Sequence, residues 1–390
     1  MTNRPQLLTV VAVVVLNAVG IFSFGIEPVM ASQLHQRLGL PSPAVALLLA
    51  AELSGSMLAA IPAAMWSRRA PARVVALLAA TLFIIANAVS AYYQTYQLLL
   101  FARGLAGLAG GTLAVLTLMI AAQAPQPARI YALWVLAQTL LAVPGLMLFT
   151  SLSARFGLGT LYAVMAAAMV ATLPLAWVLD PIRPVVADGT RAVRATRASA
   201  RRIGDAAAPL LILFMIYALA NGLWAFAAER GNQLHLSADG VDASLSAAYL
   251  ISLGGAGLAS WIGAPHRCRK LALIGHIALS LAALLFALDG GFAVFATFTI
   301  VLQLAWAFTA PLLLAIAARL EPAGWAMAPA NFLLTAGLAV GPMVTGFLID
   351  AQHGPRTIAL LSAAVLACSL ALLTTVRDLA TRDRCDPGTA

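Results

Sequence analysis

Charged residues are scarce in this chain of 390 residues: Asp, Glu, Lys and Arg together make up 9% of it, and hydrophobic residues make up 62%. A soluble domain has about 25% charged residues. The sequence also lacks a phosphate-binding Walker loop and any His/Cys cluster with metal-ligand spacing. It therefore excludes transport driven by ATP hydrolysis within this chain, and it predicts no cofactor, no metal site and no enzymatic activity.

Cysteine is also rare, with Cys268, Cys368 and Cys385 as its three occurrences. Two of them fall on the predicted cytoplasmic side and one in a predicted span, so we expect no disulfide. The apolar run after Arg4 imitates a signal peptide but is longer than the usual apolar core of one. We therefore interpret it as a retained first helix.

Long apolar stretches occupy most of the sequence, and most of them reach the roughly 20 residues that a helix needs to cross hydrocarbon. The predicted spans are 7–30, 44–65, 73–92, 97–121, 128–151, 158–179, 208–228, 241–263, 270–288, 291–317, 324–349 and 356–376. The sequence thus predicts an all-α membrane protein with twelve transmembrane helices in a lipid bilayer.

Basic residues fall mainly in alternate gaps between these spans. Eighteen lie at the N-terminus, in the even-numbered gaps and in the C-terminal tail, four lie in the odd-numbered gaps, and Arg103 lies inside a span. Positive charge concentrates on cytoplasmic loops, so both termini are predicted to be cytoplasmic, in a bacterial inner membrane. Because the charge is spread over short loops, nucleic-acid binding is a poor explanation for the isoelectric point of about 10.2.

The longest gap, 181–207, separates an N-terminal bundle of six spans (1–180) from a C-terminal bundle of six spans and a short tail (208–390). Sliding the sequence on itself by 197 positions brings related residues into register: 141–143 meets 338–340, and Gly157 meets Gly354. A constant offset over several spans predicts a duplication of six helices, related by an axis along the membrane normal.

Several short motifs accompany this organisation. The fourth span contains an arginine followed by glycines, Arg103, Gly107 and Gly111. The eleventh span contains Gly337, Gly341 and Pro342. Over its whole length the chain resembles the major facilitator superfamily, nearest in pattern to the drug/proton antiporter branch. Pro144 and Gly145 stand where that branch has its fifth-helix motif, and Arg68 is what matches the superfamily's loop after the second helix. The resemblance implies alternating access, with the first, fourth, seventh and tenth helices lining a central cavity.

Three ionisable residues lie in the predicted outer half of the N-terminal bundle, namely Glu27, Glu52 and Arg103. Each costs about 2.5–3.5 kcal/mol to insert in hydrocarbon, so its presence indicates a structural or functional role. Arg103 cannot lose its proton, which means that it requires an acidic partner or an anionic substrate. One interpretation makes Glu52 or Glu27 the proton site and Arg103 its electrostatic partner. The other is a static ion pair that holds helices together.

Polar and aromatic side chains form two matching stripes, on the first and seventh spans, and further polar residues follow on the fifth, tenth and eleventh. Together with Glu27 and Arg103, the candidate substrate-binding residues are Asn17, Phe24, Gln138, Tyr217, Asn221, Trp224, Gln303, Trp306 and Asn331. The alternative is that these side chains join packed helices. His276, in the ninth span, is predicted to serve packing or to face lipid.

These features predict a monomeric secondary transporter that moves a small organic solute by alternating access, coupled to protons, with export favoured. A mixture of Trp, Tyr, Phe, Asn and Gln suits an amphipathic or aromatic solute. One alternative is proton-coupled uptake of an organic anion held by Arg103. An alternative of another class is a receptor or accessory membrane protein that transports nothing.

Overall fold

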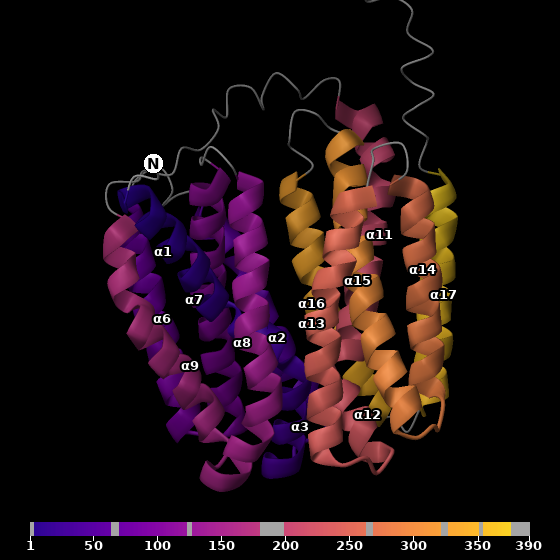
Figure 1. The fold of residues 1–390 in the computed structure, drawn as a ribbon, viewed down its shortest axis with the longest axis horizontal. Coiled ribbons are helices and arrows are strands. Elements are labelled where there is room, and N and C mark those ends of the chain that lie inside the picture. Colours follow the sequence, from indigo (N-terminus) through magenta and orange to yellow (C-terminus); the bar gives the residue numbers. More distant parts are fainter. Residues whose placement is uncertain are drawn as a thin grey trace, which may run out of the picture. The chain divides into compact units, whose positions relative to one another are not determined.

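The computed structural model describes residues 4–63, 70–122, 127–179, 199–262, 268–320, 327–350 and 354–375, and every regular element in these ranges is a helix (Figure 1). Eleven helices in the described ranges are long and apolar enough to cross a membrane, and Leu7–Gly20 is a shorter apolar helix. The predicted all-α membrane fold is confirmed. Arg68 and the linker 181–198 lie outside the described residues.

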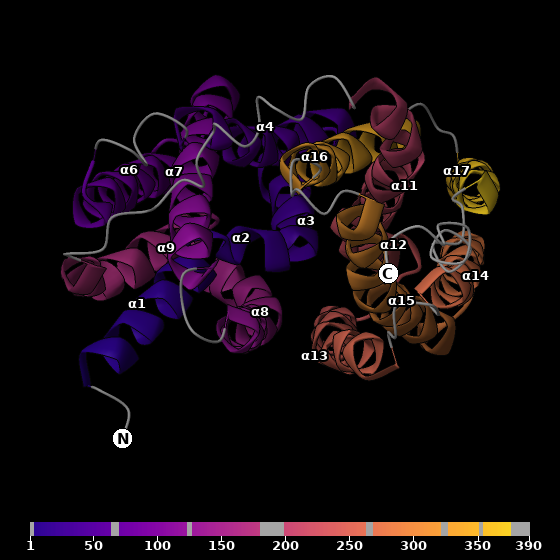
Figure 2. The same ribbon diagram turned by 90° about the horizontal axis from the view of Figure 1, so that it is seen from above.

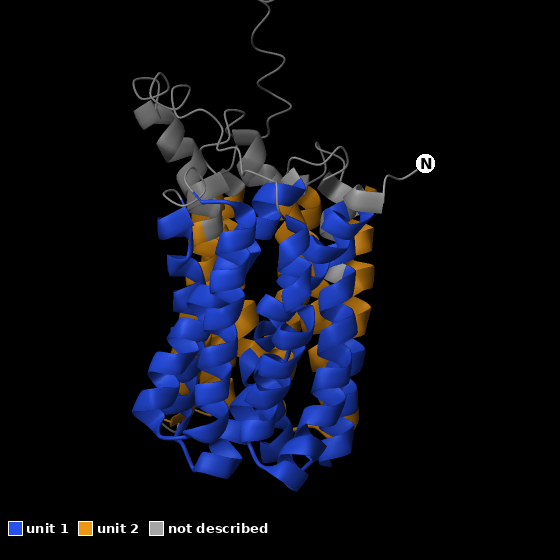
Figure 3. Cartoon of the chain, turned by 90° about the vertical axis from the view of Figure 1, so that its left-hand side faces the viewer, with its two compact units in different colours: residues 1–187, 225–249 blue, residues 188–224, 250–390 orange. Residues whose placement is uncertain are grey.

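The chain divides into two compact units (Figure 3). Unit 1 comprises Met1–Ala187 and Ala225–Tyr249, and unit 2 comprises Asp188–Trp224 and Leu250–Ala390. Unit 1 therefore contains the helices of the first half together with a short segment of the second half. The predicted boundaries 1–180, 181–207 and 208–390 follow the membrane spans rather than these contacts, and they stay a prediction.

The helices of the first half are α1 (Arg4–Gly20), α2 (Phe22–Gly25), α3 (Glu27–Leu38), α4 (Ser42–Leu58), α6 (Ala72–Tyr92), α7 (Tyr96–Ala122), α8 (Pro127–Phe156), α9 (Gly159–Thr172) and the 3₁₀ helix η1 (Leu173–Leu179). Those of the second half are α11 (Ser199–Ala225), α12 (Ala227–Gln233), α13 (Ala238–Ile262), α14 (Cys268–Ala287), α15 (Phe292–Leu320), α16 (Met327–Asp350) and α17 (Pro355–Thr375).

The first predicted span is not one helix. It is interrupted at Ile21 and Ile26, which separate α1, α2 and α3, and α3 continues as far as Leu38. Pro28 occupies the first turn of α3, where its missing N–H costs least, and its ring would clash with a preceding carbonyl in an unbroken helix. Ile26 has φ −106° and ψ 12°. Phe226, between α11 and α12, has nearly the same conformation, with φ −104° and ψ 13°.

Glycines bring α4 and α7 into backbone contact within unit 1, where α7 packs between α4 and α6 (Figure 2). A Cβ atom at Gly107 would collide with the carbonyl oxygen of Glu52, and one at Gly55 with that of Gly104. Small residues are what permits two transmembrane backbones to approach this closely. The contact fixes the height of Glu52 on α4 against the turn of α7 that carries Arg103.

Unit 2 uses the same device between α11 and α16, where a Cβ atom at Gly341 would collide with the carbonyl oxygen of Ala218. A second contact joins α14 to α17. The Nδ1 atom of His276 lies 2.6 Å from the carbonyl oxygen of Ala272, so Nδ1 donates, and Nε2 therefore accepts from the Ser369 hydroxyl at 2.8 Å. His276 is 2% exposed, which favours the packing role over the lipid-facing one.

Candidate functional site

Glu52 and Arg103 form a buried ion pair in unit 1. The Nη1 atom of Arg103 lies 3.5 Å from Oε1 of Glu52, and the two residues are 1% and 4% exposed. Of the two candidate glutamates, Glu52 is therefore the one that supplies Arg103 with an acidic partner. The structure brings these two predicted residues together, while their role in proton transfer stays a prediction.

Arg103 has further partners that the sequence analysis missed. Its Nη2 donates to Oδ1 of Asn87 at 3.0 Å and to Oγ of Ser90 at 2.9 Å, and its guanidinium lies 4.5 Å from the ring centroid of Tyr162. Asn87 and Ser90 are three residues apart on α6, and this spacing of two polar residues in an apolar span was the signal that could have revealed them. The aromatic contact of Tyr162 depends on the packing of α9.

The second contact of Glu52 also comes from an unpredicted residue. Ser23, in the short helix α2, donates its hydroxyl to Oε1 of Glu52 at 2.8 Å. Ser23 is 3% exposed. The break in the first span therefore sets a hydroxyl against the carboxylate, and residues of α2, α4, α6, α7 and α9 meet in one polar network.

This network can tolerate a change of charge on Glu52. If the carboxyl takes up a proton, Arg103 loses its counter-ion but keeps Asn87 and Ser90 as acceptors. A buried cation without any partner is strongly unfavourable, whereas one that keeps two hydrogen bonds and an aromatic face is stabilised in place.

Glu27 lies one turn beyond Ser23, in the first turn of α3. It is 3% exposed. Within unit 1 its charge acts on the hydroxyl of Tyr249 from α13. Glu27 is thus a second buried acid of unit 1.

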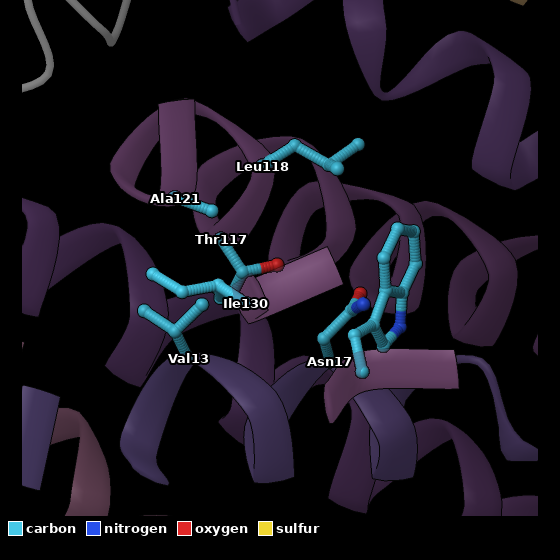
Figure 4. Close-up of a pocket in the computed structure, with 7 residues that line it drawn as sticks. Val13, Asn17, Thr117, Leu118, Ala121 and Ile130 are labelled. Atoms are coloured by element: carbon cyan, nitrogen blue, oxygen red, sulfur yellow. The ribbon is translucent and has the colours of Figure 1, made fainter. Parts of the chain in front are cut away.

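Asn17 borders a small cavity in unit 1 with a volume of about 10 Å³, room for about one water molecule (Figure 4). The other lining residues are Val13, Thr117, Leu118, Ala121, Ile130 and Trp134. The buried Oδ1 of Asn17 and Nε1 of Trp134 have no hydrogen-bond partner in the structure. Both the acceptor and the donor are therefore available to a ligand group or a water. Phe24 and Gln138, the other candidates of this half, are half-buried on α2 and α8.

The candidate residues of unit 2 are partly committed to packing. Asn221 donates its amide to the carbonyl oxygen of Leu338 at 2.9 Å and so joins α11 to α16. The rings of Tyr217 and Trp306 meet edge to face, with centroids 5.7 Å apart. Trp224 is buried on α11, and the side chain of Asn331 lies outside the described residues.

Two polar atoms of α15 stand apart from this packing. The buried Oε1 of Gln303 and Nε1 of Trp306 have no hydrogen-bond partner in the structure. Unit 2 thus repeats the combination of an amide acceptor and an indole donor found in unit 1. The prediction that both stripes face one cavity concerns the two units together, and it stays a prediction.

Comparison with known proteins identifies the fold. The structure is similar to the crystal structure of a bacterial homologue of the human lysosomal transporter Spinster, in an inward-facing and unoccupied conformation. The TM-score is 0.67, the sequences are 16% identical, and the match covers 96% of this chain and 95% of that chain. At this identity the likeness shows the fold and leaves the substrate undetermined. No curated protein matches the sequence at a significant level.

A sequence model of the Major Facilitator Superfamily matches residues 8–327, which is most of the chain. The helical fold and its structural neighbour agree with that match. The chain therefore belongs to the major facilitator superfamily and is a membrane transporter rather than an enzyme.

Proposed function

We propose that this protein is a proton-coupled secondary transporter that exports a small amphipathic organic solute by alternating access, within the drug/proton antiporter branch. The observation that carries the proposal is the buried contact between Glu52 and Arg103, 3.5 Å apart in a network with Ser23, Asn87 and Ser90. Glu52 is the proton site, and Arg103 is its electrostatic partner.

Glu52 suits this role because it is a buried acid whose contacts come from two other helices. Its carboxylate lies against the Arg103 guanidinium of α7 and accepts from the Ser23 hydroxyl of α2. A small displacement of either helix against α4 therefore changes the contacts of the carboxylate. This sensitivity is what a transporter needs in order to bind a proton in one conformation and release it in another.

The solute is proposed to be amphipathic and to carry groups that both donate and accept hydrogen bonds. Each unit offers an amide oxygen and an indole N–H without a hydrogen-bond partner among the described residues: Asn17 with Trp134 in unit 1, and Gln303 with Trp306 in unit 2. The cavity beside Asn17 has room for one small polar group rather than a whole solute, and it is otherwise lined by apolar side chains and Thr117. An uncharged polar group on an apolar or aromatic body would satisfy these atoms without bringing in a buried charge.

We place the protein in a bacterial inner membrane as a monomer with both termini in the cytoplasm. The arginine distribution supports this orientation. Arg73 belongs to the predicted cytoplasmic set of arginines, and its guanidinium lies 3.2 Å from the ring centroid of Trp177, which is 57% exposed. A tryptophan and an arginine of this kind are typical of the membrane–water interface, here the predicted cytoplasmic one.

The burial of Arg103 weighs against uptake of an organic anion bound to its guanidinium. Arg103 is 1% exposed, and Glu52, Asn87 and Ser90 already occupy its terminal nitrogens. An anionic substrate would have to reach a buried guanidinium and compete with these groups for it. A measurement of flux distinguishes a transporter from a receptor or accessory protein that transports nothing.

Purified protein in proteoliposomes tests the proposal, with uncharged and cationic aromatic dyes as probes and a pH-sensitive dye inside the vesicles. We expect the dye to move in the direction opposite to the flow of protons. The direction of dye movement should reverse when the proton gradient is reversed. Accumulation of a carboxylate probe along the proton gradient would favour the uptake alternative. No coupled movement of any probe or proton would favour a receptor.

A further inference from the structure

The short segment between the two breaks of the first span contacts both Glu52 and a part of the second half of the chain. On one side, the Ser23 hydroxyl donates to Glu52 Oε1 at 2.8 Å. Two residues later, a Cβ atom at Gly25 would lie 2.7 Å from the Cβ of Ala142 and 3.2 Å from the hydroxyl oxygen of Tyr249. The backbone of Gly25 is therefore pressed against α8 and α13, all within unit 1.

Tyr249 ends the segment Ala225–Tyr249, which belongs to unit 1 although it comes from the second half of the sequence. Several hydrogen bonds attach this segment to the N-terminal helices, among them one that Thr150 of α8 donates to Asp242. Asn232 donates to the Ser32 hydroxyl of α3 at 3.0 Å, and Ser246 donates to the carbonyl oxygen of Val143 on α8 at 3.3 Å. The contact between Tyr249 and Gly25 lies at the C-terminal end of this segment.

We propose that Ser23 is a positioning residue that transmits the protonation state of Glu52 to the contact between Gly25 and Tyr249, so that a proton on Glu52 loosens the attachment of the segment Ala225–Tyr249. The inference rests on the proposed role of Glu52 as proton site. A hydrogen bond to a carboxylate is about twice as strong as one between neutral groups. Protonation therefore weakens the hold of α4 on the short helix α2.

The backbone allows α2 to respond. Ile21 and Ile26 depart from helical geometry, so α2 is a single turn. At its end, the Ile26 N–H donates to the carbonyl oxygen of Ser23, three residues earlier, at 3.2 Å. Such a turn can rotate without opening the longer helices α1 and α3. Because Gly25 is already in tight contact with Ala142 and faces the Tyr249 hydroxyl, a small rotation alters that contact.

The effect of Glu52 has to be distinguished from the effects of other charged groups near these residues. Arg103 on α7 faces Glu52 and keeps its charge, and Tyr162 on α9 stacks on Arg103. On α3, Glu27 acts on Tyr249, and on α13 the buried Asp242 accepts a hydrogen bond from Thr150 of α8, so both acids could produce a dependence on pH. Glu27→Gln and Asp242→Asn are therefore the matched controls for Glu52→Gln, and each should leave the pH dependence in place.

The experiment measures the accessibility of the attached segment in the full chain in lipid nanodiscs. Cys268, Cys368 and Cys385 are replaced by serine, and a single cysteine is introduced by Ala228→Cys on α12, where the native side chain is 3% exposed. The probe is a polar maleimide. Its rate is divided by that of an Ala238→Cys variant, at an exposed position, which removes the effect of pH on the thiol itself.

We expect the normalised labelling rate to rise roughly fivefold from mildly alkaline to mildly acidic pH, the change produced by weakening one charge-assisted hydrogen bond. Glu52→Gln should give the high rate at every pH. Ser23→Ala should remove the pH dependence, and Ser23→Thr, which keeps a hydroxyl, should restore it. Glu27→Gln should leave the pH dependence unchanged.

The outcomes separate this inference from the proposed function. A pH dependence that persists in Ser23→Ala but disappears in Glu52→Gln overturns the role of Ser23 and leaves the proton site intact. A dependence that disappears in Glu27→Gln and persists in Glu52→Gln overturns the proton site itself. A rate that does not change with pH in the parent protein overturns the transmission. If Ser23→Ala fails to fold, Tyr249→Phe tests the other end of the contact and should also reduce the pH dependence.

Discussion

Glu52 and Arg103 meet where the backbones of α4 and α7 touch: a Cβ atom at Gly107 would collide with the carbonyl oxygen of Glu52, and four residues before Gly107 the Arg103 guanidinium lies 3.5 Å from the Glu52 carboxylate. The glycine and the ion pair are therefore parts of one helix crossing. The arginine and glycines of the fourth span, which the sequence presents as a motif, act together because one face of α7 carries both.

Glu52→Gln should abolish coupling while leaving substrate binding intact. The amide imitates a permanently protonated carboxyl, so the variant cannot release a proton between conformations. We expect proton-driven dye movement in proteoliposomes to fall to the background, and dye binding to lose its dependence on pH. Asp239→Asn, at an exposed acid of α13, is the control and should behave as the parent protein does. Normal coupling in Glu52→Gln would refute its assigned role.

Removing one member of the ion pair should cost more stability than removing both. Glu52→Leu leaves Arg103 buried without its counter-ion, and we expect a loss of about 3–5 kcal/mol in the free energy of unfolding. The double variant Glu52→Leu with Arg103→Met should regain most of that loss, because two apolar side chains replace two buried charges. Thermal unfolding in detergent measures both. A loss in the double variant equal to the sum of the losses in Glu52→Leu and Arg103→Met alone would show that the pair contributes no coupling energy.

Gly107→Ala should destabilise the protein because the added methyl group meets backbone rather than a flexible side chain. The Glu52 carbonyl cannot move without a shift of α4, and we expect a cost of about 1–3 kcal/mol, together with weaker proton coupling. Gly254→Ala on α13 is the matched control, since a Cβ atom there has no neighbour within 4 Å. It should be neutral, or stabilising by about 0.5–1 kcal/mol through helix propensity. The same thermal measurement compares the two.

Trp134→Phe and Trp306→Phe should lower transport without lowering stability. Each substitution keeps an aromatic ring and removes an indole N–H that has no hydrogen-bond partner in the structure, so the folded protein loses no internal hydrogen bond. We expect a roughly fivefold weaker apparent affinity for an amphipathic dye with hydrogen-bonding groups. A dye without such groups is the control. Lowered melting temperatures with unchanged dye affinity would assign these tryptophans to packing.

The topology can be checked with cysteines at Ser199 and Gln233, at opposite ends of the segment formed by α11 and α12. The arginine distribution predicts that position 233 reacts with an impermeant maleimide added outside intact cells and that position 199 reacts after lysis. Labelling of position 199 from outside, with protection of position 233, would invert the proposed orientation.

The amino-acid sequence was sufficient for the all-α membrane fold because hydrocarbon imposes a one-dimensional rule: a span needs about 20 apolar residues. The spans, the buried Glu52 and Arg103, and the close glycines of the fourth span were all visible in it. A charge inside a span reveals by itself that a partner is needed.

The partners themselves depend on tertiary structure. Ser23, Asn87, Ser90 and Tyr162 lie far from Glu52 or Arg103 in sequence, and they meet because a break at Ile21 and Ile26 turns α2 toward α4 and because α6 and α9 pack around α7. Periodicity specifies which face of a helix is polar but not which helix that face meets. The choice among helices is made by side-chain volume at their crossings, and so packing decided which acid pairs with Arg103.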